Sequence, residues 1–280
     1  MNIFEFINTL IYGIVEGITE WLPISSTGHM ILLEEILPIT NRLSPAEYAE
    51  FIKMFRVVIQ LGAIMAVVVL YWKKIFPFQV KEKKLSMKMD IMTLWFKILV
   101  ASVPAAIIGL LFDDWIDARF YNAQTVSVTL ILYGILFIVI ENWNKNRSAK
   151  TNTLAELSYQ SALIIGVFQL LALIPGTSRS GATIVGALLI GVSRTVAAEF
   201  TFYLAIPVMF GASFLKLLGF GFDFQTNELM ILIVAMISAF LVSVLAIKFL
   251  MTYIKKHDFK VFGYYRIALG IILIVYACLN

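Results

Sequence analysis

The sequence predicts an all-α polytopic membrane protein made of two inverted-topology repeats, each a re-entrant helical hairpin followed by three transmembrane helices. Hydrophobic residues make up 60% of the 280 residues and charged residues only 14%, which is typical of integral membrane proteins. Several apolar runs reach the roughly 20 residues that a helix needs to cross a bilayer, and a polar motif occurs twice between them. The runs are residues 51–72, 91–112, 125–143, 197–218, 229–251 and 262–279.

The two copies of the polar motif align at an offset of 153 residues. Residues 13–31 read GIVEGITEWLPISSTGHMI, and residues 166–184 read GVFQLLALIPGTSRSGATI. Each copy has an apolar approach, a proline, a cluster of hydroxyl side chains, a glycine and an apolar exit. The exits are about ten residues long, too short to span. We therefore expect re-entrant hairpins at about 3–37 and 157–190, with eight simple spans as the alternative.

The division into halves determines their relative orientation. Residues 1–150 and 151–280 each contain one hairpin and three spans, and Glu50-Phe51 also matches Glu199-Phe200. A hairpin crosses nothing and three is an odd number, so the second half must begin on the opposite side of the membrane. Folds of this kind place their sites near the bilayer midplane, where broken helices from both halves meet.

Loop charge predicts the orientation in the membrane, because cytoplasmic loops are enriched in lysine and arginine. Loops 113–124 and 219–228 are mainly acidic, and the loops on the other side are basic, so the first hairpin should open to the outer face. Basic residues inside the spans, Lys97, Lys216, Lys248 and Arg266, are expected to snorkel. The net charge of +4 gives no reason to expect a nucleic-acid partner. The basic loop residues are Lys73, Lys74, Lys81, Lys83, Lys84, Lys88, Lys145, Arg147, Lys150, Lys255, Lys256 and Lys260.

The hydroxyl clusters favour an anion site. Hydroxyl residues just before an apolar helix are natural N-caps, and a helix start presents free N–H groups and the positive end of a dipole. Arg179 adds a planar fork suited to phosphate oxygens, and two opposed anion sites suit a diphosphate. The alternatives are ordinary capping for the hydroxyls and a structural ion pair for Arg179. The candidate diphosphate-binding residues are Ser25, Thr27, Gly28, Ser178, Ser180, Gly181, Thr183 and Gln60.

Glu16 and Glu20 lie four residues apart and therefore share one face of a helix. Two carboxylates at membrane depth repel each other unless a cation lies between them, and their oxygen ligands suit Mg²⁺ or Ca²⁺. The alternative is that they pair with Arg179 or Lys53. The single cysteine of the chain excludes an internal disulfide and a cysteine-based metal cluster.

His29 follows the serines within one helical turn. It can deprotonate a serine or a water, or protonate a leaving oxygen. Gln60, in the first full span, can contact the site or hydrogen-bond between helices. The sequence leaves both readings of Gln60 open.

The segments 16–29 and 175–183, together with Phe55, Gln60 and Gly62, resemble the signature motifs of the undecaprenyl pyrophosphate phosphatases, the bacitracin-resistance proteins. This resemblance covers essentially the whole chain. It implies hydrolysis of undecaprenyl diphosphate to undecaprenyl phosphate and inorganic phosphate, which recycles the lipid carrier for cell-wall synthesis. It also implies roles for the motif residues: Ser26 as nucleophile, His29 as general acid or base, Glu16 and Glu20 as metal or proton handlers, and Arg179 as diphosphate clamp.

Two other readings of the sequence remain. A transporter or flippase of a lipid phosphate or small anion would use the same inverted-repeat site. A membrane scaffold would not explain why two glutamates, a histidine and an arginine converge. The expected partners are a polyprenyl diphosphate and membrane lipids. The oligomeric state is left open, a homodimer included.

Overall fold

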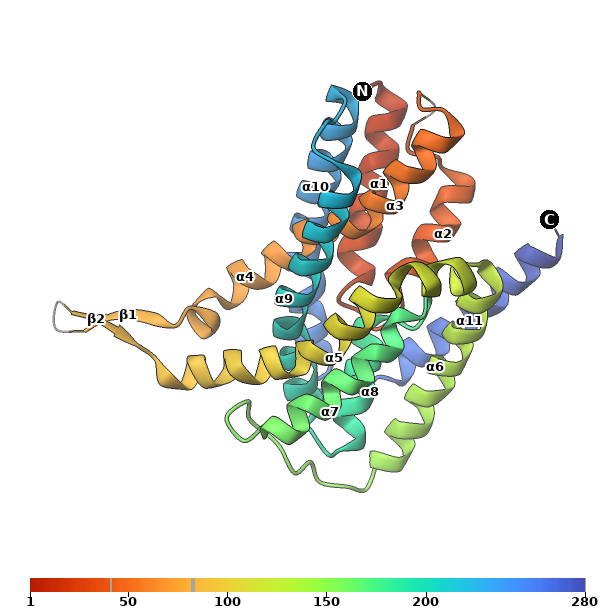
Figure 1. Ribbon diagram of the computed structural model, residues 1–280. Helices are drawn as coiled ribbons and strands as arrows, with labels where there is room; N and C mark the ends of the chain where they lie inside the picture. The colour runs from red at the N-terminus through yellow and green to blue at the C-terminus, as the bar shows by residue number, and fades with distance from the viewer. Residues whose placement is uncertain (41, 82–83, 280) are drawn as a thin grey trace.

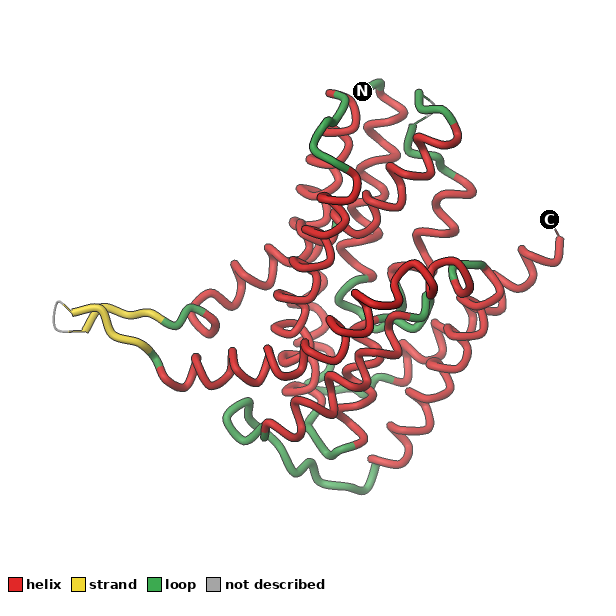
Figure 2. The backbone as a smooth tube through the Cα atoms, in the orientation of Figure 1, coloured by secondary structure: helices red, strands yellow, loops and turns green. Residues whose placement is uncertain are grey.

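The computed structural model describes residues 1–40, 42–81 and 84–279, and apart from one short β-hairpin its regular structure is helical (Figures 1 and 2). The first half contains α1 (Ile3–Thr19), α2 (Ser26–Ile36), α3 (Pro45–Val58), α4 (Gln60–Ile75), β1 (Phe78–Lys81), β2 (Lys84–Met87), α5 (Met89–Phe120) and α6 (Ala123–Asn144). The second half contains α7 (Tyr159–Gln169), the 3₁₀ turn η1 (Leu170–Leu173), α8 (Arg179–Leu189), α9 (Arg194–Phe220), α10 (Thr226–Tyr253) and α11 (Lys260–Leu279).

Within the described chain, six helical segments are long and apolar enough to cross a membrane, which confirms the predicted spans. Each begins or ends a few residues outside the predicted run, because helices continue into polar residues that cap them. Ser44 illustrates this: its side chain caps Glu47 N–H and Glu47 caps Ser44 in return, so the first span begins at Pro45. The segments are Pro45–Ile75, Met89–Phe112, Ala123–Asn144, Arg194–Phe220, Thr226–Tyr253 and Lys260–Leu279.

Two predicted loops have regular structure instead. In the 73–90 segment β1 and β2 pair antiparallel and project from the helices (Figure 1); its Lys83 lies outside the described residues. The 113–124 segment is helical as far as Phe120, because α5 continues beyond its apolar run. Polarity alone predicted a loop there, whereas the helix extends through these polar residues to Phe120.

The snorkelling prediction was wrong for Lys97 and Arg266. Lys97 is 6% exposed and donates hydrogen bonds to the carbonyls of Leu154 and Ala155. Arg266 is fully buried, and its donors also meet backbone carbonyls. Carbonyl oxygens inside the protein accept hydrogen bonds from these cations, so their N–H donors need not reach water.

α1 with α2 and α7 with α8 form two helical hairpins whose turns, here called tip 1 (residues 20–25) and tip 2 (residues 174–178), meet inside the molecule. In Figure 1, α1 and α2 extend from tip 1 toward the end that carries the N-terminus, and α7 and α8 extend toward the opposite end. α2 and α8 both have 11 residues. Both begin directly after a hydroxyl residue of the duplicated motif.

The two tips share an unusual backbone conformation. Ser25 has φ 73° and Ser178 has φ 71°, and among the described non-glycine residues only these two have positive φ. Each serine caps its helix by accepting a hydrogen bond, from Gly28 N–H at 3.4 Å and from Gly181 N–H at 3.2 Å. Positive φ is costly for a residue with a Cβ and is concentrated at functional sites. The strain marks both tips as places where shape matters more than local stability.

Each hairpin packs on a helix from the other half of the chain. A Cβ at Gly13 of α1 would lie 2.5 Å from Ser238 Cβ on α10, and one at Gly166 of α7 would lie 2.2 Å from Ala101 O on α5. A Cβ at Gly134 of α6 would lie 2.7 Å from the Gly263 carbonyl oxygen of α11. These glycines let helix backbones approach each other, as small residues do in membrane bundles. The close packing fixes each hairpin against a long helix of the other half.

Candidate active site

Glu20 links the two tips. Its Oε2 accepts a hydrogen bond from Ser26 Oγ, the first residue of α2, at 3.0 Å. Its Oε1 accepts from Arg179 Nη2, the first residue of α8, at 3.0 Å. Ser180 Oγ adds a bond to the Glu20 carbonyl at 3.2 Å. A single buried carboxylate therefore orients a hydroxyl from one motif and a guanidinium from the other, and the ion pair expected as an alternative is present.

Arg179 is held by elements outside the motifs. Nη1 donates to the carbonyl of Thr201 on α9 at 2.8 Å, and the guanidinium carbon lies 5.8 Å from the Trp21 ring centre. Thr201 Oγ1 in turn donates to Thr183 Oγ1 at 2.8 Å. Arg179 Nε is buried and has no hydrogen-bond partner. These contacts fix the orientation of the guanidinium, and Nε remains a donor without a partner.

Glu16 lies one helical turn before Glu20 and is 1% exposed. Its Oε1 is buried without a hydrogen-bond partner. A carboxylate oxygen in this state is costly unless a ligand, a cation or a proton compensates it. The described residues include no group of three His, Cys, Asp or Glu side chains that could hold a metal. Two carboxylates fit a cation that takes its remaining oxygen ligands from phosphate and water, as Mg²⁺ commonly does.

His29 lies on α2 and contacts α11. Its Nδ1 is 2.8 Å from Ser25 O, which can only accept, so Nδ1 carries the proton. Its Nε2 lies 2.7 Å from Tyr265 Oη, and the two rings are nearly parallel with centres 5.6 Å apart. The described residues provide no bond from His29 to Ser26. Glu20, rather than His29, is the group in contact with the Ser26 hydroxyl.

The remaining hydroxyl residues of the two motifs differ in their surroundings. Ser25 and Ser178 are helix caps, and Ser178 Oγ also lies 3.1 Å from Ser180 Oγ. Thr183 is fully buried and bonds to its own helix and to Thr201, so it supports Arg179 from behind. Thr27 is half-buried on the first turn of α2.

Gly28 and Gly181 lie in the first turns of the two helices. A Cβ at Gly28 would meet Leu130 at 3.2 Å, and one at Gly181 would meet Arg266 Nη1 at 3.2 Å. Gln60 begins α4 and makes no hydrogen bond to either tip within the described part of the chain. The structure thus brings together Glu20, Arg179 and the serines, and among the described residues Gln60 has no hydrogen bond to them.

Sequence reasoning missed the contribution of α11. Tyr265 contacts His29, and Arg266 bonds to both tips. The one available signal was an arginine inside an apolar span, which calls for a buried partner or a functional role. Thr201 of α9 could not be recognised from the sequence, because its backbone carbonyl, not its side chain, accepts the hydrogen bond from Arg179.

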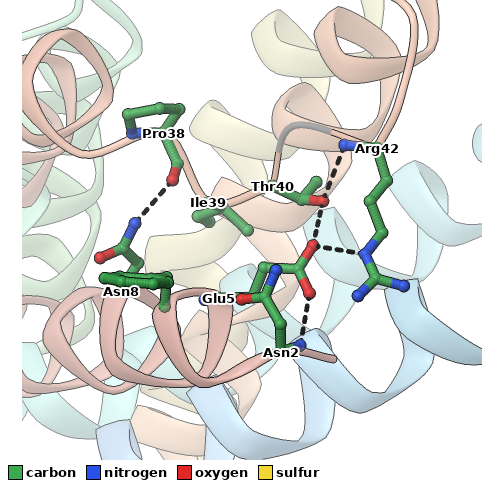
Figure 3. Close-up of a pocket in the computed structure, with 8 residues that line it drawn as sticks. Asn2, Glu5, Asn8, Pro38, Ile39, Thr40 and Arg42 are labelled. Carbon is green, nitrogen blue, oxygen red and sulfur yellow. Dashed lines mark hydrogen bonds and ion pairs between the residues drawn. The ribbon is translucent and has the colours of Figure 1, made fainter.

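A second polar cluster lies at the other end of the first hairpin and is separate from the tips (Figure 3). Glu5 Oε1 accepts from Thr40 Oγ1 at 2.6 Å and pairs with Arg42 Nε at 3.0 Å. Asn8 Nδ2 donates to the Pro38 carbonyl at 2.8 Å. These bonds join the start of α1 to the chain after α2. They close the first hairpin at its base, at the end of α1 away from tip 1.

Known proteins match the chain over nearly all its length. Residues 9–272 match the family described as Bacitracin resistance protein BacA. Undecaprenyl-diphosphatase of Enterococcus faecalis is 62% identical over 276 residues, which cover 98% of each chain. The proteins of the same name from Acetivibrio thermocellus and Desulfitobacterium hafniense are 63% identical over 272 residues and 61% identical over 277 residues. The match to the Acetivibrio thermocellus protein covers 97% of each chain. The match to the Desulfitobacterium hafniense protein covers 99% of this chain and 97% of that protein.

Proposed function

The chain belongs to the bacitracin resistance protein BacA family, and we propose that its two hairpin tips form the site where it hydrolyses undecaprenyl diphosphate. The protein is an undecaprenyl-diphosphate phosphatase: it converts the diphosphate and water to undecaprenyl phosphate and inorganic phosphate. The observation that carries the proposed site is Glu20, which accepts hydrogen bonds from Ser26 of one motif and Arg179 of the other. Transport as an alternative is not favoured, because the close relatives are named diphosphatases.

In the proposed reaction Glu20 takes the proton from Ser26 Oγ, which attacks the terminal phosphorus. The bond between that phosphorus and the bridging oxygen breaks, and undecaprenyl phosphate leaves with the bridging oxygen. A water then releases inorganic phosphate from Ser26 and restores the hydroxyl. Direct attack by a water that Glu20 or His29 deprotonates gives the same products. In both routes His29, one turn after Ser26, exchanges protons with the oxygens of the phosphate.

Charge stabilisation comes from preorganised groups at the tips. The first turns of α2 and α8 present free N–H groups and positive dipole ends, which favour phosphate oxygens. Arg179 supplies a full positive charge to the same place, with one donor not yet used. Groups held in place before the reaction stabilise the developing charge without reorganisation. The tips thus supply both the nucleophile and its electrostatic support.

A divalent cation, Mg²⁺ or Ca²⁺, is proposed to bind between Glu16 and Glu20. The support is the buried and unpartnered Oε1 of Glu16, one turn from the Glu20 carboxylate. A bound cation would neutralise the negative charge that accumulates on the phosphate oxygens. We expect a chelator to lower phosphate release by at least about tenfold and added Mg²⁺ or Ca²⁺ to restore it. Full activity in excess chelator would exclude the cation and leave Glu16 as a proton handler.

The proposed topology is a pair of inverted repeats with both tips at the membrane midplane. Its support is the matched pair of strained serines, the equal lengths of α2 and α8, and hairpins that pack on the opposite halves. The lysine-rich loops are proposed to face the cytoplasm, so that the first hairpin opens to the outer face. The undecaprenyl chain then leaves the site sideways into lipid between apolar helices.

Variants in tip 1 and at the start of α2 test the proposed site. We expect Ser26→Ala and Glu20→Gln to lower phosphate release from undecaprenyl diphosphate by about 10²–10⁴-fold, because each removes a nucleophile or its base. Ser148→Ala, in an exposed loop, is the matched control. Substrate binding should persist in Ser26→Ala. Wild-type turnover in folded Ser26→Ala and Glu20→Gln proteins would place the chemistry elsewhere.

A further inference from the structure

We propose that Arg266 of α11 is a positioning residue of the phosphatase site, because it donates hydrogen bonds to the backbone of both hairpin tips and holds them in register. This inference rests on the site proposed above and extends it to a helix outside both motifs. No part of Arg266 needs to touch the substrate for this role. It acts through the backbone of the residues that do.

The hydrogen bonds of Arg266 reach both tips. Nη1 donates to the Pro23 carbonyl of tip 1 at 3.3 Å. Nη2 donates to the Gly176 and Thr177 carbonyls of tip 2, both at 2.9 Å. Nε donates to the Leu130 carbonyl of α6 at 3.4 Å. One planar guanidinium therefore joins four backbone carbonyls from three separate elements, which a single-nitrogen cation could not do.

Among the described residues, few other side chains donate hydrogen bonds to the backbone carbonyls of the tips. Pro23 precedes the strained Ser25 by two residues, and Thr177 directly precedes the strained Ser178. Thr129 Oγ1 of α6 adds a bond to the Pro175 carbonyl at 2.8 Å. The donors of Arg266 thus lie beside the two residues whose backbone is least favourable. A brace at these points keeps the positive-φ serines, and the helices they cap, aimed at each other.

Arg266 also carries an uncompensated charge. It is 0% exposed, and no described carboxylate pairs with it; the centre of the Tyr133 ring lies 5.5 Å from the guanidinium carbon. Burying a guanidinium without an anion is expensive. Its Nη1 lies 3.2 Å from where a Cβ at Gly181 would be, directly behind the first turn of α8. An anion bound at that turn would supply the missing charge, so the cost of burial is offset when the diphosphate binds.

Lys97 provides a matched comparison. It is also a buried cation in a long helix, and it also donates to two carbonyls, those of Leu154 and Ala155. Those carbonyls lie before α7, at the end of that helix away from tip 2. Lys97→Met should therefore affect folding without affecting tip geometry. Arg266→Met should affect both.

The test compares Arg266→Met, Arg266→Lys, Arg266→Gln and Lys97→Met in detergent, with kcat and KM for undecaprenyl diphosphate measured per folded molecule and thermal stability measured alongside. Loss of the brace displaces the reacting groups, and a displacement of about 1 Å costs about 100-fold in rate. We expect kcat to fall about 100-fold in Arg266→Met and at least about tenfold in Arg266→Lys. KM should change less than kcat, and Lys97→Met should keep wild-type kcat at a lower Tm.

Wild-type kcat in folded Arg266→Met would overturn the inference, as would equal losses of kcat in Arg266→Met and Lys97→Met. If no Arg266 variant folds while Lys97→Met does, the residue is a folding requirement and the inference is also overturned. Ser26→Ala in the same assay separates the two proposals. An inactive Ser26→Ala with a fully active Arg266→Met removes only the brace, whereas an active Ser26→Ala removes the proposed site itself.

Discussion

Arg179 shows at the scale of one residue why an arginine, and not merely a cation, suits this site. Nη2 donates to Glu20 and Nη1 to the Thr201 carbonyl, so the side chain connects tip 1, α8 and α9. Lysine has one nitrogen and cannot hold this geometry or present a fork to a phosphate. We expect Arg179→Lys to lower kcat/KM about 10- to 100-fold, which corresponds to one or two lost charged hydrogen bonds.

The control for this change is Arg147→Lys, an exposed arginine between α6 and α7 that stacks on Trp143. Both variants should be assayed by phosphate release at several substrate concentrations. If Arg179→Lys matched the wild type within about twofold, charge alone would account for the role of Arg179.

Tyr265 acts on His29 in a more limited way. Its hydroxyl donates to Nε2 at 2.7 Å while its ring stacks on the imidazole. Tyr265→Phe keeps the stacked ring and removes only the hydrogen bond, worth about 0.5–1.5 kcal/mol. We therefore predict a fall in kcat of roughly 2- to 10-fold, measured by phosphate release. Tyr264→Phe, on the exposed face of the same helix, should be neutral, and an equal effect of both changes would dissociate Tyr265 from the chemistry.

At the scale of helices, each hairpin has a glycine at the same position of the sequence repeat that packs closely on a helix of the other half. A Cβ at Gly13 or Gly166 would overlap Ser238 or the backbone at Ala101, whereas one at Gly211 would meet nothing within 4 Å. Overpacking typically costs about 1–3 kcal/mol. Gly13→Ala and Gly166→Ala should lower the Tm of the purified protein and Gly211→Ala should not, as thermal unfolding in detergent would show. Equal Tm values for all three variants would show that the close contacts at Gly13 and Gly166 do not limit the stability of the protein.

Predictability from sequence differs between elements for a physical reason. Hydropathy is a local property, so the six long helices followed from composition along the chain. The duplicated motif predicted that Glu20 and Arg179 face each other, which their hydrogen bond confirms, whereas the role of Ser26 as nucleophile came from the family resemblance and stays a prediction. The β-hairpin at 78–87 and the helical 113–120 segment could not be predicted, because polar residues near a membrane suit loops, strands and helix ends alike.

The surroundings of the buried cations were harder to predict. Arg266 and Lys97 bond to backbone carbonyls, and every residue has a carbonyl, so their partners leave no trace in the sequence. The same holds for the Thr201 carbonyl that orients Arg179. Contacts between side chains can be anticipated from pairs of residue types. Contacts to backbone require the fold.

At the scale of the whole molecule, the fold and the chemistry meet in the orientation of the two hairpins. The spans and the family place the protein in the membrane as a multi-pass protein. The lysine-rich loops predict that the segment between α9 and α10 lies outside and that the segment between α10 and α11 lies in the cytoplasm. Asp223 and Lys255 are exposed positions in these two segments.

Cysteine labelling tests this orientation directly. Cys278, the one native cysteine and an exposed one, is first replaced by serine. In intact protoplasts a membrane-impermeant maleimide should then label Asp223→Cys and leave Lys255→Cys unlabelled until the membrane is permeabilised, because positive loops are retained in the cytoplasm. Labelling of Lys255→Cys alone in intact protoplasts would reverse the topology. The first hairpin, with Glu20, Ser26 and His29, would then open to the cytoplasm, and substrate would have to approach from that side.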